Sequence, residues 1–121
     1  MWRDPHGRRW AAMEHQGRIE IYPDWGDTDP PPGTPPEIEV APRVIDLVHA
    51  GDQISGTLHR RFGKGADFCD VAVPIHVSAC HGSTIEIEIA EPPAPTAYKP
   101  CALPAIPYPV RETWTWVGTG P

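Results

Sequence analysis

The choice of apolar residues constrains the fold of this chain more than any other feature of its sequence. Ten Ile and eight Val stand against only three Leu. β-Branched side chains lose rotamer freedom in a helix and suit the pleated surface of a sheet. In addition, 17 of the 121 residues are Pro, and a proline inside a helix removes a hydrogen bond and clashes with the preceding turn. We therefore expect an all-β protein.

Two neighbouring segments show the clearest strand periodicity. In 69–77 the apolar side chains fall on the odd positions, so that face should lie in the core. Pro74 falls on the other face and predicts an edge position or a bulge. Segment 84–90 repeats the pattern, with Ile at every second position expected to point inward. We predict that the two segments form a hairpin with a longer turn at 78–83, which carries Cys80, His81 and Gly82.

Shorter segments carry weaker strand signals. Alternation predicts further strands at 18–22, 37–40, 53–58 and 111–117. Segment 44–48 fits a strand or a short helix equally well, and 10–14 has room for one helical turn. About five to seven short strands separated by turn residues predict a small antiparallel β-sandwich or barrel.

Local composition divides the chain into parts, although 121 residues is the usual size of a single domain. Residues 1–18 carry four Arg and two Trp without strand periodicity, and we expect an extended basic arm there. The β domain spans 19–91 and is interrupted by a proline-rich linker at 29–36. A proline-rich extended segment covers 92–109, and a C-terminal strand follows at 110–117.

Charge and hydropathy narrow the class of partner. The net charge of −6 argues against a nucleic-acid backbone, which favours a basic surface. The sequence has no apolar run of about eighteen residues to span a membrane, and no apolar run follows the first arginines as in a signal peptide. We expect a soluble protein, in the cytoplasm or in a virion, whose partners are proteins.

Cysteine and histidine residues supply the main candidate for metal or redox chemistry. One Cys₃His set of the kind that Zn²⁺ accepts consists of Cys69, Cys80, His81 and Cys101. The gaps of 11 and 21 residues differ from the close pairs of familiar zinc sites. The alternatives are a disulfide between two of the cysteines, or ordinary thiols. The sequence lacks the motifs of hydrolases, phosphate-binding loops and dinucleotide sites, so we expect no enzyme and no cofactor.

The interpretation that accounts for the whole chain is a non-enzymatic structural or assembly protein. Its extended arms would contact neighbouring subunits in a homo-oligomer or a larger assembly, for example as a capsid decoration or tail component of a virion. Aromatic anchors dominate such contacts, so the candidate partner-binding residues are Trp2, Trp10, Trp25, Tyr108, Trp114 and Trp116. An alternative is an adaptor whose proline-rich piece, 103–109, docks on a groove of another domain. No motif in the chain matches a family residue by residue.

Overall fold

The computed structural model describes residues 1–24, 29–98 and 100–118. These residues form strands and connecting segments, without a helix among them. The strands are β1 (Trp2–Arg3), β2 (Arg9–His15), β3 (Arg18–Pro23), β4 (Glu39–Val40), β5 (Val44–Ala50), β6 (Gln53–Lys64), β7 (Asp67–His81), β8 (Thr84–Ile89), β9 (Ala97–Tyr98), β10 (Cys101–Ala102) and β11 (Val110–Trp116). The expectation of an all-β protein is confirmed.

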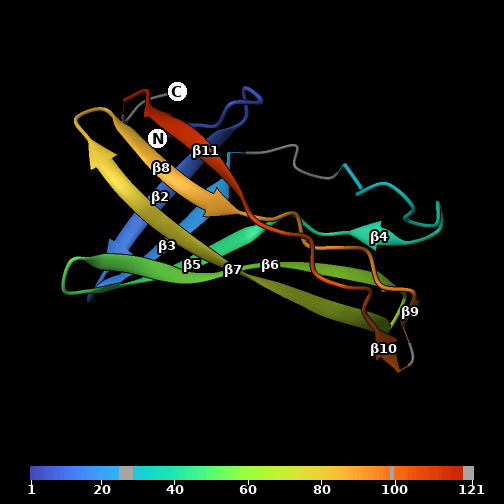
Figure 1. Cartoon of the computed structure of the whole chain (residues 1–121). Coiled ribbons are helices and arrows are strands. Elements are labelled where there is room, and N and C mark those ends of the chain that lie inside the picture. The colour runs from blue at the N-terminus through green and yellow to red at the C-terminus, as the bar shows by residue number, and fades with distance from the viewer. Residues whose placement is uncertain (25–28, 99, 119–121) are drawn as a thin grey trace.

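Eight of the strands close into one antiparallel β-barrel (Figure 1). Around the barrel the order is β6, β5, β3, β2, β1, β11, β8 and β7, and β7 pairs with β6 to complete the circle. Closure removes the free edges that an open sheet would expose to other chains. Of the two architectures expected from the sequence, the chain adopts the barrel.

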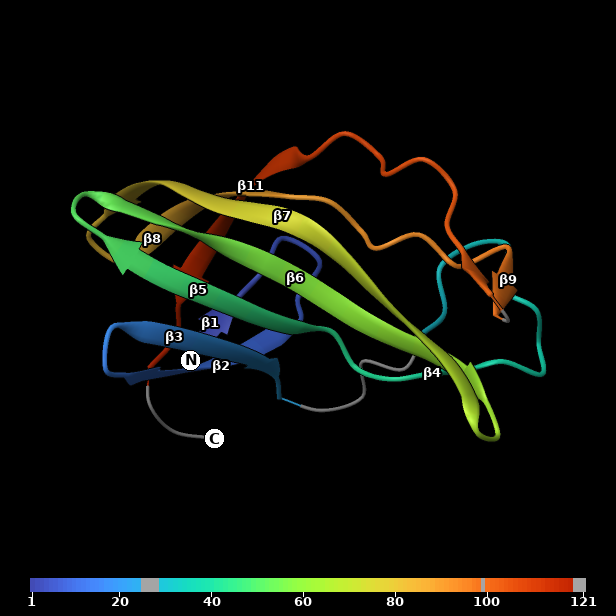
Figure 2. The same cartoon turned by 90° about the horizontal axis from the view of Figure 1, so that it is seen from below.

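The β6–β7 hairpin is the longest element and reaches beyond the rest of the barrel (Figure 2). On one side, β5 accompanies β6 only as far as His59. On the other, β8 accompanies β7 only as far as His76. The outer part of the hairpin is flanked instead by β4, which pairs with β6 at Phe62 and Gly63, and by the proline-rich segment that follows β8.

Side chains fill the interior of the barrel, as expected for eight strands. Trp10 of β2 and Trp114 of β11 are wholly buried and stack with their ring centroids 5.1 Å apart. Aliphatic side chains from the other strands surround this pair: Ile21, Ile45, Leu47, Leu58, Val73, Ile75, Ile87 and Ile89. The barrel is therefore a packed, rigid scaffold.

The periodicity of 69–77 correctly predicts the inward face of β7. Cys69, Val71, Val73 and Ile75 are all buried. Pro74 is exposed and pairs with Thr57 of β6 on one side only, because the β8 ladder starts two residues later. Proline cannot donate a ladder hydrogen bond, and the edge position expected for it is confirmed.

The turn between β7 and β8 is shorter than expected. β7 continues to His81, and only Gly82 and Ser83 separate it from Thr84. A register shift between Val77 and Ala79 marks a bulge in β7. Ser78, which we expected at the start of a loop over 78–83, lies in this bulge instead. Cys80 and His81 therefore end a strand.

Residues 1–18 form barrel strands instead of the expected arm. β1 pairs with both β11 and β2, and β2 joins β3 through Gln16 and Gly17, whose φ angles of 52° and 81° suit a tight hairpin turn. Burial of Trp10 holds β2 in the barrel although its other side chains show no alternation. Segments 10–14 and 44–48 are likewise strand, within β2 and β5.

Candidate interaction surface

Residues 92–109, called the strap below, leave the barrel after β8 and return to it at β11 (Figures 1 and 2). Glu91 fixes the start of the strap. Its two carboxylate oxygens each lie 2.9 Å from an Nη1 atom, one of Arg43 and the other of Arg60. These arginine side chains are only 7% and 2% exposed, and charge-assisted bonds of this length are strong. Since Pro92 is also fully buried, the strap begins firmly attached to the barrel.

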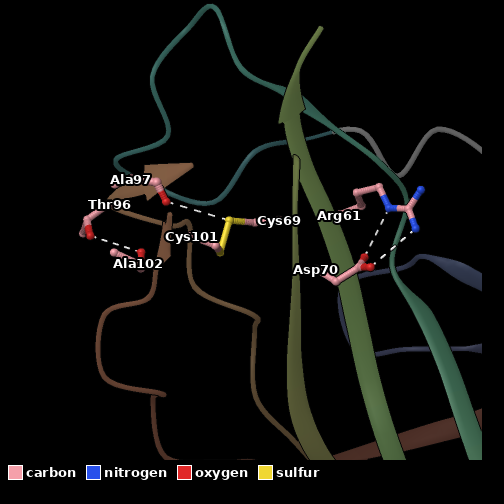
Figure 3. Close-up of a disulfide and its surroundings, with 7 residues drawn as sticks. All are labelled: Arg61, Cys69, Asp70, Thr96, Ala97, Cys101 and Ala102. Atoms are coloured by element: carbon pink, nitrogen blue, oxygen red, sulfur yellow. Dashed lines mark hydrogen bonds and ion pairs between the residues drawn. A yellow bond between two sulfur atoms is a disulfide. The ribbon is translucent and has the colours of Figure 1, made fainter. Parts of the chain in front are cut away.

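A disulfide between Cys69 and Cys101 ties the middle of the strap to the outer part of β7 (Figure 3). It joins residues 32 positions apart in the sequence. Next to it, β9 and β10 form a small hairpin in which the Thr96 N–H donates to the carbonyl of Ala102 at 2.7 Å. The bridged Sγ of Cys69 also lies 3.8 Å from the carbonyl oxygen of Ala97. Strap and barrel are thus covalently joined at this hairpin.

The return half of the strap and the first residue of β11 expose a run of apolar side chains. Four large ones lie between positions 103 and 110, with exposed fractions of 46% for Leu103, 51% for Ile106, 95% for Tyr108 and 58% for Val110. These four residues, called the apolar patch below, are four of the nine large hydrophobic side chains exposed in the described part of the chain. Scattered hydrophobics need no explanation, but a concentration of them does.

A pocket of about 370 Å³ lies beside the apolar patch, next to the end of β8. Tyr108 belongs to its lining, together with residues of the β1–β2 connection and of β11. In it, Nε2 of His6 lies 3.5 Å from Oε2 of Glu112, and the other carboxylate oxygen accepts a hydrogen bond of 3.1 Å from the Trp114 indole. The apolar patch therefore adjoins a hollow that contains the pair of His6 and Glu112.

A second hollow, of about 560 Å³, lies between the strap and the other proline-rich segment, 29–36. Seven prolines line it: Pro31, Pro32, Pro35, Pro93, Pro95, Pro104 and Pro107. Proline has no backbone N–H, so the proline positions of the two segments cannot donate to a ladder between them. Segment 29–36, the linker expected from the sequence, thus faces the strap across this hollow.

The tryptophans expected at a partner surface have different roles in the structure. Trp10 and Trp114 are wholly buried core residues, so the fold leaves no surface of theirs for a partner. Trp2 packs edge-to-face against Trp116, with the ring centroids 5.3 Å apart. Of this second pair, Trp116 is 41% exposed and Trp2 is half-buried.

Tyr108 is the expected partner-binding residue with the greatest exposure, and Trp25 lies outside the described residues. The expectation omitted Leu103, Ile106 and Val110 as individual site residues because it relied on aromatic anchors. A signal for them existed in the sequence, since apolar side chains within a proline-rich run have no ladder or helix face to bury them.

The four residues considered as zinc ligands do not come together. Cys69 and Cys101 are bridged, whereas a zinc ligand is a thiolate. Cys80 is exposed and free, and with His81 it lies at the other end of β7, about 36 Å from Cys69 at the rise of an extended strand. Among the described residues, no group of three or more His, Cys, Asp or Glu is placed to hold a metal ion. Of the alternatives left open, the structure contains one disulfide and one free thiol.

Comparisons with known proteins identify no relative: no protein-family model matches the chain, and no curated protein or solved structure does. Within the described residues there is no helix of the length and hydropathy required to cross a membrane. Inferences about function therefore depend on the geometry of this chain alone.

Proposed function

We propose that this protein is a non-enzymatic structural or assembly protein, and that its apolar patch binds a neighbouring copy of the same chain. The observation that carries the proposal is the concentration of Leu103, Ile106, Tyr108 and Val110 on one exposed run. Concentrated apolar exposure on a folded protein is typical of a protein-interaction site. Tyr108 is the expected anchor, because aromatic residues at interface centres supply much of the binding energy.

The tethers of the strap support this role. Immobilising a flexible side chain on binding costs about 0.5–1.5 kcal/mol, and a segment fixed beforehand avoids part of that cost. The exposed run is fixed at one end by the disulfide at Cys101 and at the other by the pairing of Val110 with Ile89. Its prolines restrict the backbone further. Folding thus orders the patch before a partner arrives.

A virion component, such as a capsid decoration or tail protein, is the concrete form that we propose. Such a component needs a small rigid domain that contacts copies of itself repeatedly, and the packed barrel with its exposed strap meets that requirement. The disulfide between Cys69 and Cys101 suits an assembly that works in an oxidising environment.

A second candidate function is an adaptor that presents the strap to a different protein. Pro104, Pro107 and Pro109 lie in a segment without helix or strand, and proline-rich segments of this kind dock on aromatic-lined grooves of recognition domains. The two functions differ in the state of the isolated protein. The assembly role requires that it associates with itself, and the adaptor role requires a monomer.

Native mass spectrometry of the untagged protein over a range of concentrations tests the assembly role. The test variant is the triple substitution Leu103→Ser, Ile106→Ser and Tyr108→Ser. A matched control changes Met13, Tyr22 and Val48 to Ser, because these side chains are also exposed, at 64%, 37% and 49%, but lie on β2, β3 and β5.

We expect a multimer for the wild-type protein and the control, and a monomer for the strap variant. Far-UV circular dichroism should show the same β structure for all three, because none of the changed residues is in the core. A wild-type protein that stays monomeric at every concentration would contradict the assembly role and favour the adaptor. A strap variant that still forms the multimer would show that another surface makes the contact.

A further inference from the structure

The disulfide holds the part of the strap that carries the apolar patch. Beside the bridge between Cys69 and Cys101, Sγ of Cys69 lies 3.8 Å from the carbonyl oxygen of Ala97. The ion pairs of Glu91 lie at the other end of the strap. The ladder of β11 begins only at Val110. The S–S bond is therefore a covalent tie in the middle of the strap, between these two ends.

The two bridged sulfurs differ in their access to solvent. Cys69 is 2% exposed and lies on the inward face of β7. Cys101 belongs to β10, whose two residues are both exposed. Thiol–disulfide exchange requires that an attacking thiolate reaches one sulfur of the bridge. Cys101 is therefore the more exposed residue of the bridge and the expected point of attack.

We propose that the disulfide between Cys69 and Cys101 is a redox switch that controls the apolar patch, an inference that rests on the assembly role proposed above. The reductant is a dithiol. One of its thiolates attacks Sγ of Cys101, the bond between the two cysteine sulfurs breaks, and Cys69 leaves as a thiolate that takes up a proton. The second thiolate then displaces Cys101, which is protonated in turn. Two electrons and two protons pass to the protein, and the reductant leaves as its own disulfide.

Reduction frees the strap between its two ends. The oxidised bridge pins position 101, so the patch lies on a short tethered run. Once the bridge opens, the strap loses its covalent tie between the ion pairs of Glu91 and the ladder that starts at Val110. A partner then has to order the segment when it binds, which weakens association. Cys80 cannot replace either bridged cysteine, because it lies at the far end of β7.

Hydrogen–deuterium exchange with peptide-level mass spectrometry tests the switch. The measurement uses the full chain with Cys80→Ser, which prevents exchange between the free thiol and the bridge. Oxidised protein is compared with protein treated with a dithiol, and with a variant that also carries Cys69→Ser and Cys101→Ser. Peptides from β8 serve as the internal reference, since that strand is paired on both sides.

We expect exchange in peptides covering 96–103 to rise about tenfold or more on reduction, with β8 unchanged, because the opening is local. The double cysteine variant should match the reduced protein. Unchanged exchange in 96–103 would overturn the switch, since other contacts would then hold the strap. A rise throughout the barrel would overturn it too, because the bridge would then stabilise the whole fold.

Native mass spectra of the same samples complete the test. The switch predicts multimers for the oxidised protein and at least a tenfold loss of the multimeric fraction after reduction. If exchange in 96–103 rises but the multimer persists, the strap opens without controlling assembly, and the switch is wrong. If the oxidised protein is already monomeric, the assembly role fails, whereas the exchange data still report whether the bridge controls the strap.

Discussion

The carboxylate of Asp4 should stabilise the barrel more than any exposed acid does. Asp4 lies between β1 and β2 and is 5% exposed. Its Oδ1 accepts hydrogen bonds from the backbone N–H groups of His6 and Arg8, both at 2.9 Å. Its Oδ2 accepts a bond of 3.1 Å from the buried indole N–H of Trp10. One side chain thus fixes the β1–β2 connection to the centre of the core.

Substitution of Asp4 by Ala leaves these three donors without their acceptor. A buried donor that loses its partner costs about 1–3 kcal/mol, and a partly buried one that can reach water costs about 0.5–1.5 kcal/mol. The structure places one donor in the first class and two in the second. We therefore expect Asp4→Ala to lower the free energy of unfolding by about 2–6 kcal/mol. Asp4→Asn keeps one carbonyl oxygen for the backbone groups and should cost about 1–3 kcal/mol.

Guanidinium chloride denaturation followed by tryptophan fluorescence measures these differences. Glu14→Ala is the control, because Glu14 is an exposed carboxylate on the neighbouring β2 and should change stability by no more than about 0.5 kcal/mol. Trp10→Phe removes the indole donor, so Asp4→Asn should cost about 1 kcal/mol less in that background. If Asp4→Ala falls within the range of the control, the hydrogen-bond reasoning is refuted.

Two further predictions concern the backbone at Gly56 and the buried hydroxyl of Tyr98. A Cβ at Gly56 would lie 1.9 Å from the carbonyl oxygen of Asp46. Gly56→Ala should therefore lower the free energy of unfolding by about 3 kcal/mol or more. A thermal midpoint within 2 °C of wild type, about the shift expected from less than 1 kcal/mol, would count against this prediction. The Tyr98 hydroxyl is buried without a hydrogen-bond partner among the described residues, so Tyr98→Phe should be neutral or stabilising in denaturant titrations, and a loss above about 1 kcal/mol would disprove it. Burial raises the pKa of Tyr98 above its usual 10.0, so the folded state holds the phenolic proton more tightly than the unfolded state does. The free energy of unfolding should therefore fall as the pH rises above 10. The fall should be less steep in Tyr98→Phe.

The sequence predicts the strands that have a buried face and a polar face. In β7 and β8 the alternation is regular, and the buried positions follow it. Prediction fails for β2, where Trp10 is the one fully buried side chain and the outer residues are exposed. One large aromatic residue supplies the burial that several aliphatic residues supply elsewhere, and a single residue gives no period.

Contacts between distant parts of the chain are the other feature that the periodicity of the sequence cannot predict. The barrel closes through β6 and β7, which are neighbours in sequence, but also through β1 and β11 at opposite ends of the chain. Which cysteine pairs with Cys69 depends on where the strap crosses β7. The sequence, with three cysteines, could not decide this pairing. The exposure of Leu103 and Ile106 likewise depends on the side of the strap that faces the barrel.

Hydroxyl-radical footprinting of the tyrosines tests most directly whether the apolar patch is the contact between copies. Tyr108 is 95% exposed in the single chain, and Tyr22, 37% exposed on β3, is an internal reference in the same sample. As the protein concentration rises into the range where the multimer forms, we predict that the modification rate of Tyr108 falls several-fold while that of Tyr22 stays constant. A multimer in which Tyr108 is modified as fast as in the monomer would contradict the proposal.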